Sequence, residues 1–205
     1  MVEWSIAAFR ACDSVASIVV ACPPGHAHDL EGDDLTVVDG GAMRAQSVSN
    51  ALGAVGAELV AIHDAARPLI RPALIDEVVA TLLADPDAAG AIAATPVTDT
   101  IKAVEGARPP FASDDMGNGG FVIEASVDRD RLWAAQTPQV FRVDALAAAL
   151  AADPDRVAAA TDEAMIIEAV GGRVLIHPSP AENLKVTTPL DLSLAELLLA
   201  ERSAQ

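Results

Sequence analysis

The sequence lacks several features that would mark other classes of protein. Its 205 residues include no Tyr, only 3% aromatic residues and two Cys. A packed interior must therefore be built from Ala, Val, Leu and Ile, which agrees with an apolar content of 52%. A chain this apolar is globular, because disordered chains have too few apolar groups to form a core. No CxxC spacing is present, so we expect Cys12 and Cys22 to be buried reduced thiols, not a redox or zinc motif.

Long apolar runs and positive charge are also scarce. No run reaches the ~18 apolar residues of a membrane span, and the start, MVEWSIAAFRAC, has no signal-peptide pattern. Thirteen Lys and Arg stand against thirty Asp and Glu, giving a formal net charge of −17. An acidic surface repels nucleic acids and anionic membranes. We therefore expect no nucleic acid, no membrane and a cytoplasmic location, although a small basic pocket can still hold a phosphorylated metabolite.

The chain does contain an alternation of short apolar runs and longer helical patterns. The runs read as strands are 16–22, 35–40, 58–64, 89–96 and 172–178, and the patterns read as helices are 47–55, 71–85, 142–153, 161–170 and 188–202. Several strands are apolar at consecutive positions, as in sheets that helices cover on both faces. The sequence thus predicts one α/β domain over residues 1–205, with a doubly wound, mostly parallel, Rossmann-like sheet.

Three helix starts carry recognisable signals. Pro72 occupies a plausible first helical position, and Thr161 is the candidate N-cap of the helix that follows it. Thr188 and Asp191 have the spacing of a near capping box at the start of the last helix.

Residues 97–128 break the alternation. Two strand-like pieces, TIKAV and FVIEASV, flank a turn rich in Pro, Gly and Asp. We interpret them as a β-hairpin arm. An isolated hairpin is marginally stable, so we expect this arm to pack on a partner subunit and form a homodimer. A surface flap on a monomer is the alternative.

The clearest candidate site follows the apolar run Leu59–Ile62, where His63 and Asp64 place a base and an acid in one loop. Ligands of open α/β sheets bind beyond the carboxyl ends of strands. Asp64 in that position suits a divalent cation or a sugar hydroxyl. Arg67 either clamps an anion or forms a purely structural pair with Asp64.

Other candidate residues lie at similar junctions. Gly41 lets the backbone approach a flat ligand and Ser47 offers a hydroxyl, although any tight turn uses Gly-Gly. Lys185, in NLKVTTP, is one of only two lysines and can reach a phosphate, with a solvated lysine as the alternative. Arg129 lies in the acidic arm, and Thr137 begins a segment, Thr-Pro-Gln, that we read as a rigid polar turn.

Taken together, these segments resemble one family. The segments VDGGAMRAQSV, IHDAARP, PVTDTIK, VDRDRLWAAQTPQVF, TDEAMIIEAVGGRV and NLKVTTPLDLSLAELLL occur in the order and approximate spacing of the methylerythritol phosphate cytidylyltransferases. The resemblance runs from Trp4 onward. It implies a nucleotidyltransferase that couples CTP to methylerythritol phosphate, a sugar-alcohol phosphate, in the non-mevalonate isoprenoid route. Pyrophosphate is released, and Mg²⁺ bridges the triphosphate.

The resemblance also implies roles for particular residues. On the nucleotide side, Gly41 and Ser47 would contact the cytosine and its surroundings, and Asp64 would hold sugar hydroxyls or the metal. Arg67 would line the place where the two ligands meet, and Thr137 is counted among the substrate-binding residues.

On the acceptor side, the catalytic residues would be Arg129 and Lys185. Arg129 would reach across a dimer and hold the substrate phosphate together with Thr100. Thr161 would help to seat that phosphate, and Lys185 would orient it for attack.

One part of the family pattern has no counterpart here. The family begins with a strand and a Gly-rich loop that carries an Arg and a Pro-Lys pair, on the order of 30 residues. We expect residues 1–205 to be an N-terminally truncated form of a longer reading frame. Two other hypotheses stay open: a catalytically impaired nucleotide- or partner-binding remnant, and a cytidylyltransferase that acts on a pentitol phosphate.

Overall fold

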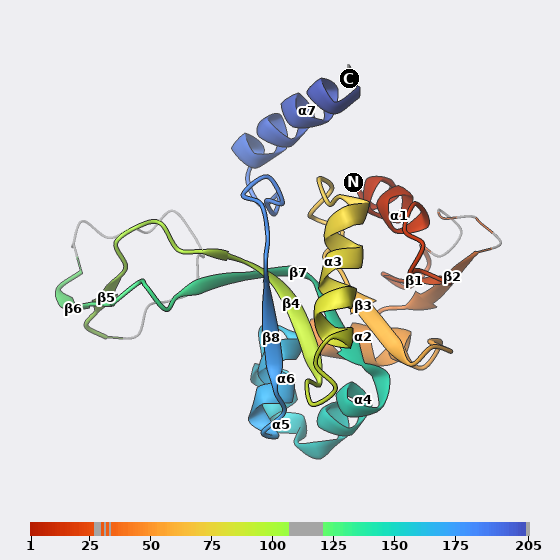
Figure 1. Ribbon diagram of the computed structural model, residues 1–205, viewed down its shortest axis with the longest axis horizontal. Coiled ribbons are helices and arrows are strands. Elements are labelled where there is room, and N and C mark those ends of the chain that lie inside the picture. The colour runs from red at the N-terminus through yellow and green to blue at the C-terminus, as the bar shows by residue number, and fades with distance from the viewer. Residues whose placement is uncertain (27–29, 31, 33, 107–120, 204–205) are drawn as a thin grey trace. The chain divides into compact units, whose positions relative to one another are not determined.

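The structure, a computed structural model, describes residues 1–26, 30, 32, 34–106 and 121–203 (Figure 1). The chain forms two compact units. The first consists of Met1–Ala94 and Ala135–Gln205, and the second of Thr95–Ala134. Among the described residues, no helix is both long enough and apolar enough to cross a membrane.

The strands of the first unit form two sheets. In the smaller one, β1 (Ile18–Cys22) pairs in parallel with β2 (Leu35–Asp39). The larger has the order β3-β7-β4-β8, formed by Leu59–Ile62, Trp133–Arg142, Gly90–Pro96 and Val174–Pro178. Strands β4 and β8 are parallel, whereas β3 and β7 are antiparallel. The predicted α/β class with a mostly parallel sheet is confirmed.

Seven helices lie in the described part of this unit: α1 (Val2–Arg10), α2 (Arg44–Leu52), α3 (Pro72–Leu83), α4 (Val143–Ala152), α5 (Pro154–Ala159), α6 (Glu163–Ala169) and α7 (Pro189–Ser203). The larger sheet has α3 on one face and α4 and α6 on the other, as in a doubly wound arrangement (Figure 1).

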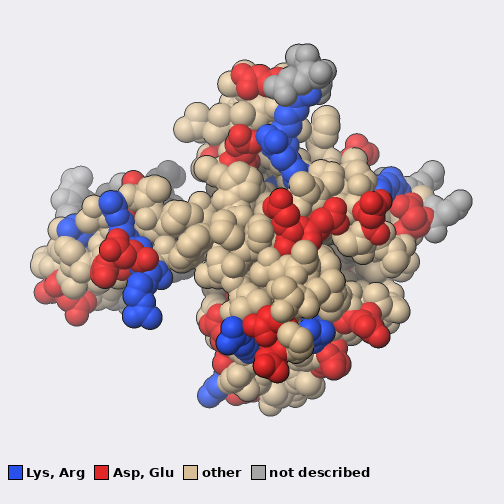
Figure 2. Space-filling model, in the orientation of Figure 1, with Lys and Arg blue, Asp and Glu red and all other residues tan. Residues whose placement is uncertain are grey.

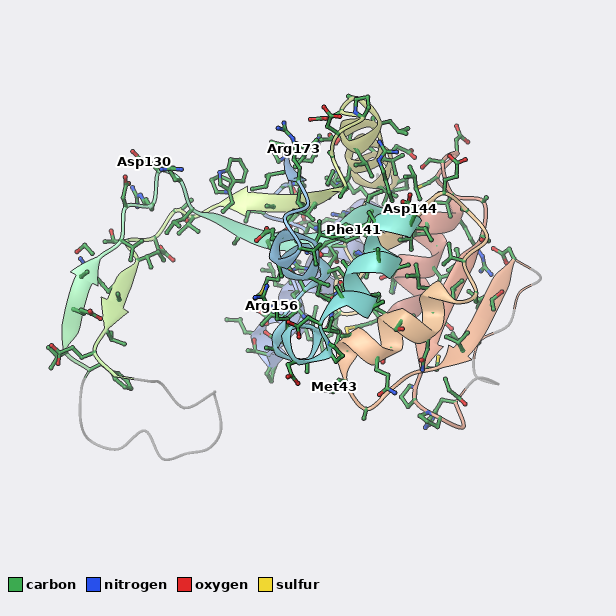
Figure 3. The ribbon with its side chains drawn as sticks, turned by 90° about the horizontal axis from the view of Figure 1, so that it is seen from below. Met43, Asp130, Phe141, Asp144, Arg156 and Arg173 are labelled. Carbon is green, nitrogen blue, oxygen red and sulfur yellow. The ribbon has the colours of Figure 1, made fainter. Side chains whose placement is uncertain are left out.

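The core shows why both faces are covered. Along β4, Ala91 and Ala93 pack against α1 and α3, whereas Ile92 packs with Phe141 against α4 and α6. This alternation follows from the two-residue period of a strand. Phe141 is fully buried, among the helices of that face (Figure 3). A Cβ at Gly90 would lie 2.3 Å from the Phe141 ring, so only glycine fits there.

The helix starts differ in how well the sequence predicted them. Pro72 begins α3 as expected. At α7 the capping box is present, because Thr188 Oγ1 accepts from the Asp191 amide at 3.2 Å and Asp191 accepts from the Thr188 amide at 2.8 Å. The expected N-cap of α6 was wrong: Asp162, not Thr161, accepts from the Met165 amide.

Strand β7 and helix α5 were not predicted. The segment Thr137–Gln139, expected as a polar turn, lies inside β7 and is buried. The prediction failed because Pro is rare within strands, and Thr-Pro-Gln therefore resembled a break. The cis Thr137–Pro138 bond lies within this paired strand.

A cavity of about 710 Å³ separates β1 from β3. Consecutive residues of both strands line it, Ile18–Ala21 on one side and Leu59–Ile62 on the other. A strand presents alternate residues from its face and consecutive residues from its edge, so both strands turn an edge to the cavity. Arg44, Ser47 and Asp64 also line it, and the cavity is therefore continuous with the candidate site described below.

The second unit contains the predicted hairpin strands. Strand β5 (Lys102–Val104) pairs antiparallel with β6 (Ile123–Ser126), and Lys102 lies opposite Ser126. Residues 107–120 of the expected 97–128 arm lie outside the described residues. The pairing is confirmed, whereas packing of the arm on a partner subunit stays a prediction.

Candidate active site

The loop after β3 carries Asp64, which contacts several distant segments through its backbone and its side chain. Asp64 donates its backbone N–H to Thr137 Oγ1 at 3.0 Å, and its carbonyl accepts from the Arg67 amide at 2.9 Å. The Val186 amide donates to the Ala66 carbonyl at 2.8 Å, which ties this loop to the segment that carries Lys185. Segments far apart in the sequence are thus joined by backbone contacts.

Three cations converge on the Asp64 carboxylate. Lys185 Nζ lies 3.0 Å from Oδ2, Arg67 Nε 3.8 Å from Oδ2, and Arg44 Nη2 3.7 Å from Oδ1. Burial raises the pKa of Asp64, but the hydrogen bond from Lys185 and the three positive charges outweigh it. The pKa of Asp64 lies below its usual value, so the carboxylate is ionised at neutral pH.

Sequence reasoning found three members of this cluster and missed the others. Asp64, Arg67 and Lys185 were predicted. Arg44, in the Gly-rich segment, and Glu163, in TDEA, stood inside quoted motifs and received no role. Arg44 Nη1 donates to Glu163 Oε1 at 2.5 Å, and Glu163 is fully buried.

His63 is not available as a base. Its Nδ1 contacts Thr137 Oγ1 at 3.0 Å and its Nε2 contacts the Arg67 carbonyl at 3.2 Å. Its ring also packs on Phe9. Burial lowers the pKa of His63 to about 4, so the ring is neutral at pH 7. With a neutral ring, Nε2–H donates to Arg67 and Nδ1 accepts from Thr137. His63 and Thr137 therefore shape the loop that positions Asp64.

Arg67 supports the same loop from the buried side. Its guanidinium is buried and donates to the Asn183 carbonyl at 2.8 Å. Burial lowers the pKa of Arg67, and Asp64 opposes that effect. The Asn183 side-chain amide in turn donates to Gln136 Oε1 and to the Thr137 carbonyl. This geometry fits the structural pair that the sequence left open for Arg67, and its contact with a ligand stays a prediction.

The Gly-rich segment forms a closed turn before α2. The Gly41 amide donates to Ser47 Oγ at 3.0 Å, and Ser47 Oγ donates to the Met43 carbonyl at 3.2 Å. A Cβ at Gly41 would lie 2.3 Å from Gln46 Cγ, which explains the glycine. Ser47 lines the cavity beside Asp64, and the contact of this turn with a base stays a prediction.

The remaining predicted residues are not drawn into this cluster. Thr161 is exposed, and its hydroxyl contacts Met165 Sδ at 3.1 Å. Thr100 and Arg129 belong to the second unit, where both are exposed and Arg129 donates to the Thr98 carbonyl. Their roles stay predictions.

The side chains around Asp64 indicate how the expected Mg²⁺ could be bound. Among the described residues, no group of three or more His, Cys, Asp or Glu is placed to hold a metal ion. Asp64 is a single carboxylate, and among the residues that the structure describes its Oδ1 has only the long contact to Arg44. One carboxylate fits Mg²⁺ when substrate phosphates supply further oxygens, but it does not fit a cage made of protein alone.

The site contrasts with its surroundings. On the face shown in Figure 2, Asp and Glu side chains are spread over several elements. At the cluster, three cations lie among three carboxylates, those of Asp64, Asp162 and Glu163, so cations are as numerous as carboxylates here in a chain of net charge −17. Such a place attracts phosphate groups and leaves a carboxylate for hydroxyls or a cation.

Comparison with known proteins agrees with this arrangement. The family model described as 2-C-methyl-D-erythritol 4-phosphate cytidylyltransferase matches residues 1–201. A protein of that name from Bordetella petrii is 39% identical, over 96% of this chain and 84% of its own length. The crystal structure of the Thermus thermophilus cytidylyltransferase superposes with a TM-score of 0.77 at 34% identity, covering 97% of this chain and 88% of that one.

A bifunctional enzyme IspD/IspF from Anaeromyxobacter is 40% identical over 94% of this chain. Here the chain spans about half of the relative, 48% of its length. The family model and the Bordetella petrii protein both match almost the whole chain. The chain therefore belongs to the 2-C-methyl-D-erythritol 4-phosphate cytidylyltransferase family.

Proposed function

We propose that this protein transfers a cytidylyl group from CTP to 2-C-methyl-D-erythritol 4-phosphate. The observation that carries the proposal is the convergence of Lys185, Arg44 and Arg67 on Asp64 at the end of β3. A reaction between two phosphorylated molecules needs concentrated positive charge, and three cations meet at this point of an acidic chain.

In this reaction a phosphate oxygen of the acceptor bonds to the α-phosphorus of CTP. The bond from that phosphorus to the oxygen bridging the β-phosphate breaks, and pyrophosphate leaves. Catalysis of such a transfer depends on positioning and on stabilising charge on the non-bridging oxygens. We assign Lys185, 46% exposed at its side chain, to the phosphate that attacks.

The nucleotide would lie along the cavity beside the Gly-rich turn. Gly41 and Ser47 would face the base, and Asp64 would bond sugar hydroxyls. Mg²⁺, when bound, would supply positive charge at the phosphates, with Asp64 as its protein ligand. Thr137 and Arg67 would hold the Asp64 loop in place from the buried side.

The acceptor would need residues from the arm. We propose that Thr100 and Arg129 of a partner subunit, together with Thr161, bind the acceptor phosphate in a homodimer built through residues 97–128. The exposed apolar residues of this unit, among them Val122 and Ile123, support an interface. A cytoplasmic location, expected from the sequence, stays a prediction.

The test is an assay of pyrophosphate release from CTP and 2-C-methyl-D-erythritol 4-phosphate in the presence of Mg²⁺. We expect release with this acceptor and little with a pentitol phosphate at the same concentration. A preference for the pentitol phosphate would change the acceptor. Tight CTP binding by calorimetry with no release for either acceptor would support the binding remnant instead.

A further inference from the structure

Glu163 is a buried charged group that the proposed mechanism does not use. Its side chain has no solvent exposure. One oxygen, Oε1, accepts from Arg44, and the other, Oε2, has no hydrogen-bond partner among the described residues. Burying a carboxylate with one partner is costly. The cap of α6 does not need it, because Asp162 already fills that position.

Arg44 lies between the carboxylates of Glu163 and Asp64, and its guanidinium is much closer to Glu163. Its Nη1 is 2.5 Å from Glu163 Oε1, whereas its Nη2 is 3.7 Å from Asp64 Oδ1. The first distance is a hydrogen bond and the second is too long for one. Arginine and a carboxylate prefer a two-pronged pair, so Glu163 competes with Asp64 for this guanidinium.

Because Arg44 is hydrogen-bonded to Glu163, one carboxylate oxygen of Asp64 has no hydrogen bond from Arg44. Its Oδ2 is occupied by Lys185 at 3.0 Å, while Oδ1 faces Arg44 without a hydrogen bond. An oxygen in that state can accept from a hydroxyl or bind a cation. If Arg44 closed onto it, a ligand would first have to break the new ion pair.

We propose that Glu163 is a positioning residue that holds Arg44 back from Asp64 and so keeps Asp64 Oδ1 available to the nucleotide. The inference deepens the proposed function and rests on it for its kinetic consequence. Its structural consequence, the position of Arg44, does not depend on catalysis.

The first test is the structure of Glu163→Gln. The Gln side chain has the same shape but lacks the charge, so Arg44 should move until it hydrogen-bonds Asp64, at ~2.9 Å. Glu168→Gln is the matched control, since Glu168 lies exposed on the same helix. An Arg44 that stays 3.7 Å from Asp64 in Glu163→Gln, the distance seen here, would overturn the inference.

The second test is kinetic. In Glu163→Gln, a smaller fraction of the protein should have Asp64 Oδ1 free to accept from the nucleotide. This should raise KM for CTP about tenfold and change kcat by less than about twofold. A role limited to joining α2 and α6 would lower stability and the active fraction, with KM unchanged, and that result would contradict the proposal. Glu168→Gln should match the wild type.

The third test removes Arg44, the residue through which Glu163 is proposed to act. In an Arg44→Met background, Glu163→Gln should cause no further rise in KM, because Glu163 acts through Arg44. An additive rise would overturn the inference. If wild-type protein releases no pyrophosphate, the proposed function fails, while the position of Arg44 in the variant structure still decides the role of Glu163.

Discussion

At the scale of single residues, the site depends on the few cations of an acidic chain. Lys185 is one of two lysines, and it forms the shortest of the three cation contacts to Asp64. Its side chain is nearly half exposed, and an ion pair that exposed contributes little to stability. Its role should therefore be visible in activity and not in folding.

Replacing Lys185 with Met should lower kcat/KM by ~10²–10³, since it removes one preorganised charge from the transition state. The free energy of unfolding should change by less than ~1 kcal/mol. Pyrophosphate release and urea denaturation measure the two quantities. Arg173→Met is the control, because Arg173, labelled in Figure 3, pairs with Asp85 and not with Asp64. A loss of activity as large in the control would remove the special role of Lys185.

His63 leads to a prediction about pH. Its pKa is lowered from 6.5 to about 4 in the folded protein, so the unfolded chain binds a proton more readily. This contribution to stability is complete above about pH 6.5 and is lost as pH falls towards 4. The loss should reach about 3 kcal/mol at most.

Urea denaturation between pH 7 and pH 4 measures this loss, and His63→Gln isolates it. The variant should lose less stability than the wild type over that range, because Gln does not titrate. Parallel curves for the two proteins would show that His63 does not carry the effect. Protonation of carboxylates affects both proteins, so only the difference between the curves counts.

The residues that the sequence missed have a common physical reason. Lys185 was predicted because the chain has only two lysines, and Asp64 because it follows the end of a strand. Arg44 is one of eleven arginines, so scarcity did not single it out. Glu163 stands in the first turn of a helix, where acidic residues are favoured by the helix dipole. Its complete burial comes from packing of distant segments, which local sequence does not encode.

At the scale of elements, hydrophobic periodicity predicted those strands that are apolar throughout. It missed β7 because Pro138 interrupts the pattern in the middle of the strand. It placed the start of α6 one residue early, at Thr161, because Thr and Asp are both good N-caps. Tertiary contact decided the choice: Asp162 also accepts from the buried Gln139 side chain at 2.9 Å.

The two short helices α5 and α6 offer a paired prediction. Asp162→Ala should destabilise the protein by about 2 kcal/mol, because it removes the cap and leaves one N–H of the buried Gln139 side-chain amide unsatisfied. For a chain of this length that corresponds to a fall in melting temperature of about 4–8 °C. Calorimetry or circular dichroism measures the fall.

The comparison is Asp153→Ala at the cap of α5. Asp153 accepts from two amides of that helix, but α5 buries no residue, so its loss can remain local. We expect a cost below about 0.5 kcal/mol. Equal costs at the two helices would show that the tether to Gln139 adds nothing.

At the scale of the whole molecule, the sequence predicted the α/β class and its mostly parallel sheet, because strands covered on both faces leave a distinct apolar pattern. It could not show the order β3-β7-β4-β8, in which the unpredicted β7 lies between β3 and β4. Pairing between strands is a long-range property that each strand's own residues do not specify. The hairpin, whose two strands are close in sequence, was predicted correctly.

The proposed homodimer is the property of the whole molecule most open to test. Val122 and Ile123, 61% and 57% exposed, lie at the start of β6 in the arm. If the arm packs on a partner subunit, these apolar side chains become buried there. A charge at both positions should then disfavour assembly, since an unpaired charge is costly to bury.

The double variant Val122→Glu, Ile123→Glu should shift the mass in sedimentation from about twice the 21.0 kDa of one chain to that of a single chain. Leu190→Glu, on α7 and 77% exposed, adds the same kind of charge outside the arm and should leave the dimer intact. Because Thr100 and Arg129 would then be missing from the partner's site, the double variant should also raise KM for the acceptor more than KM for CTP. A wild-type protein that sediments as a monomer, or an arm variant that remains dimeric with an unchanged KM for the acceptor, would contradict an arm that completes the site.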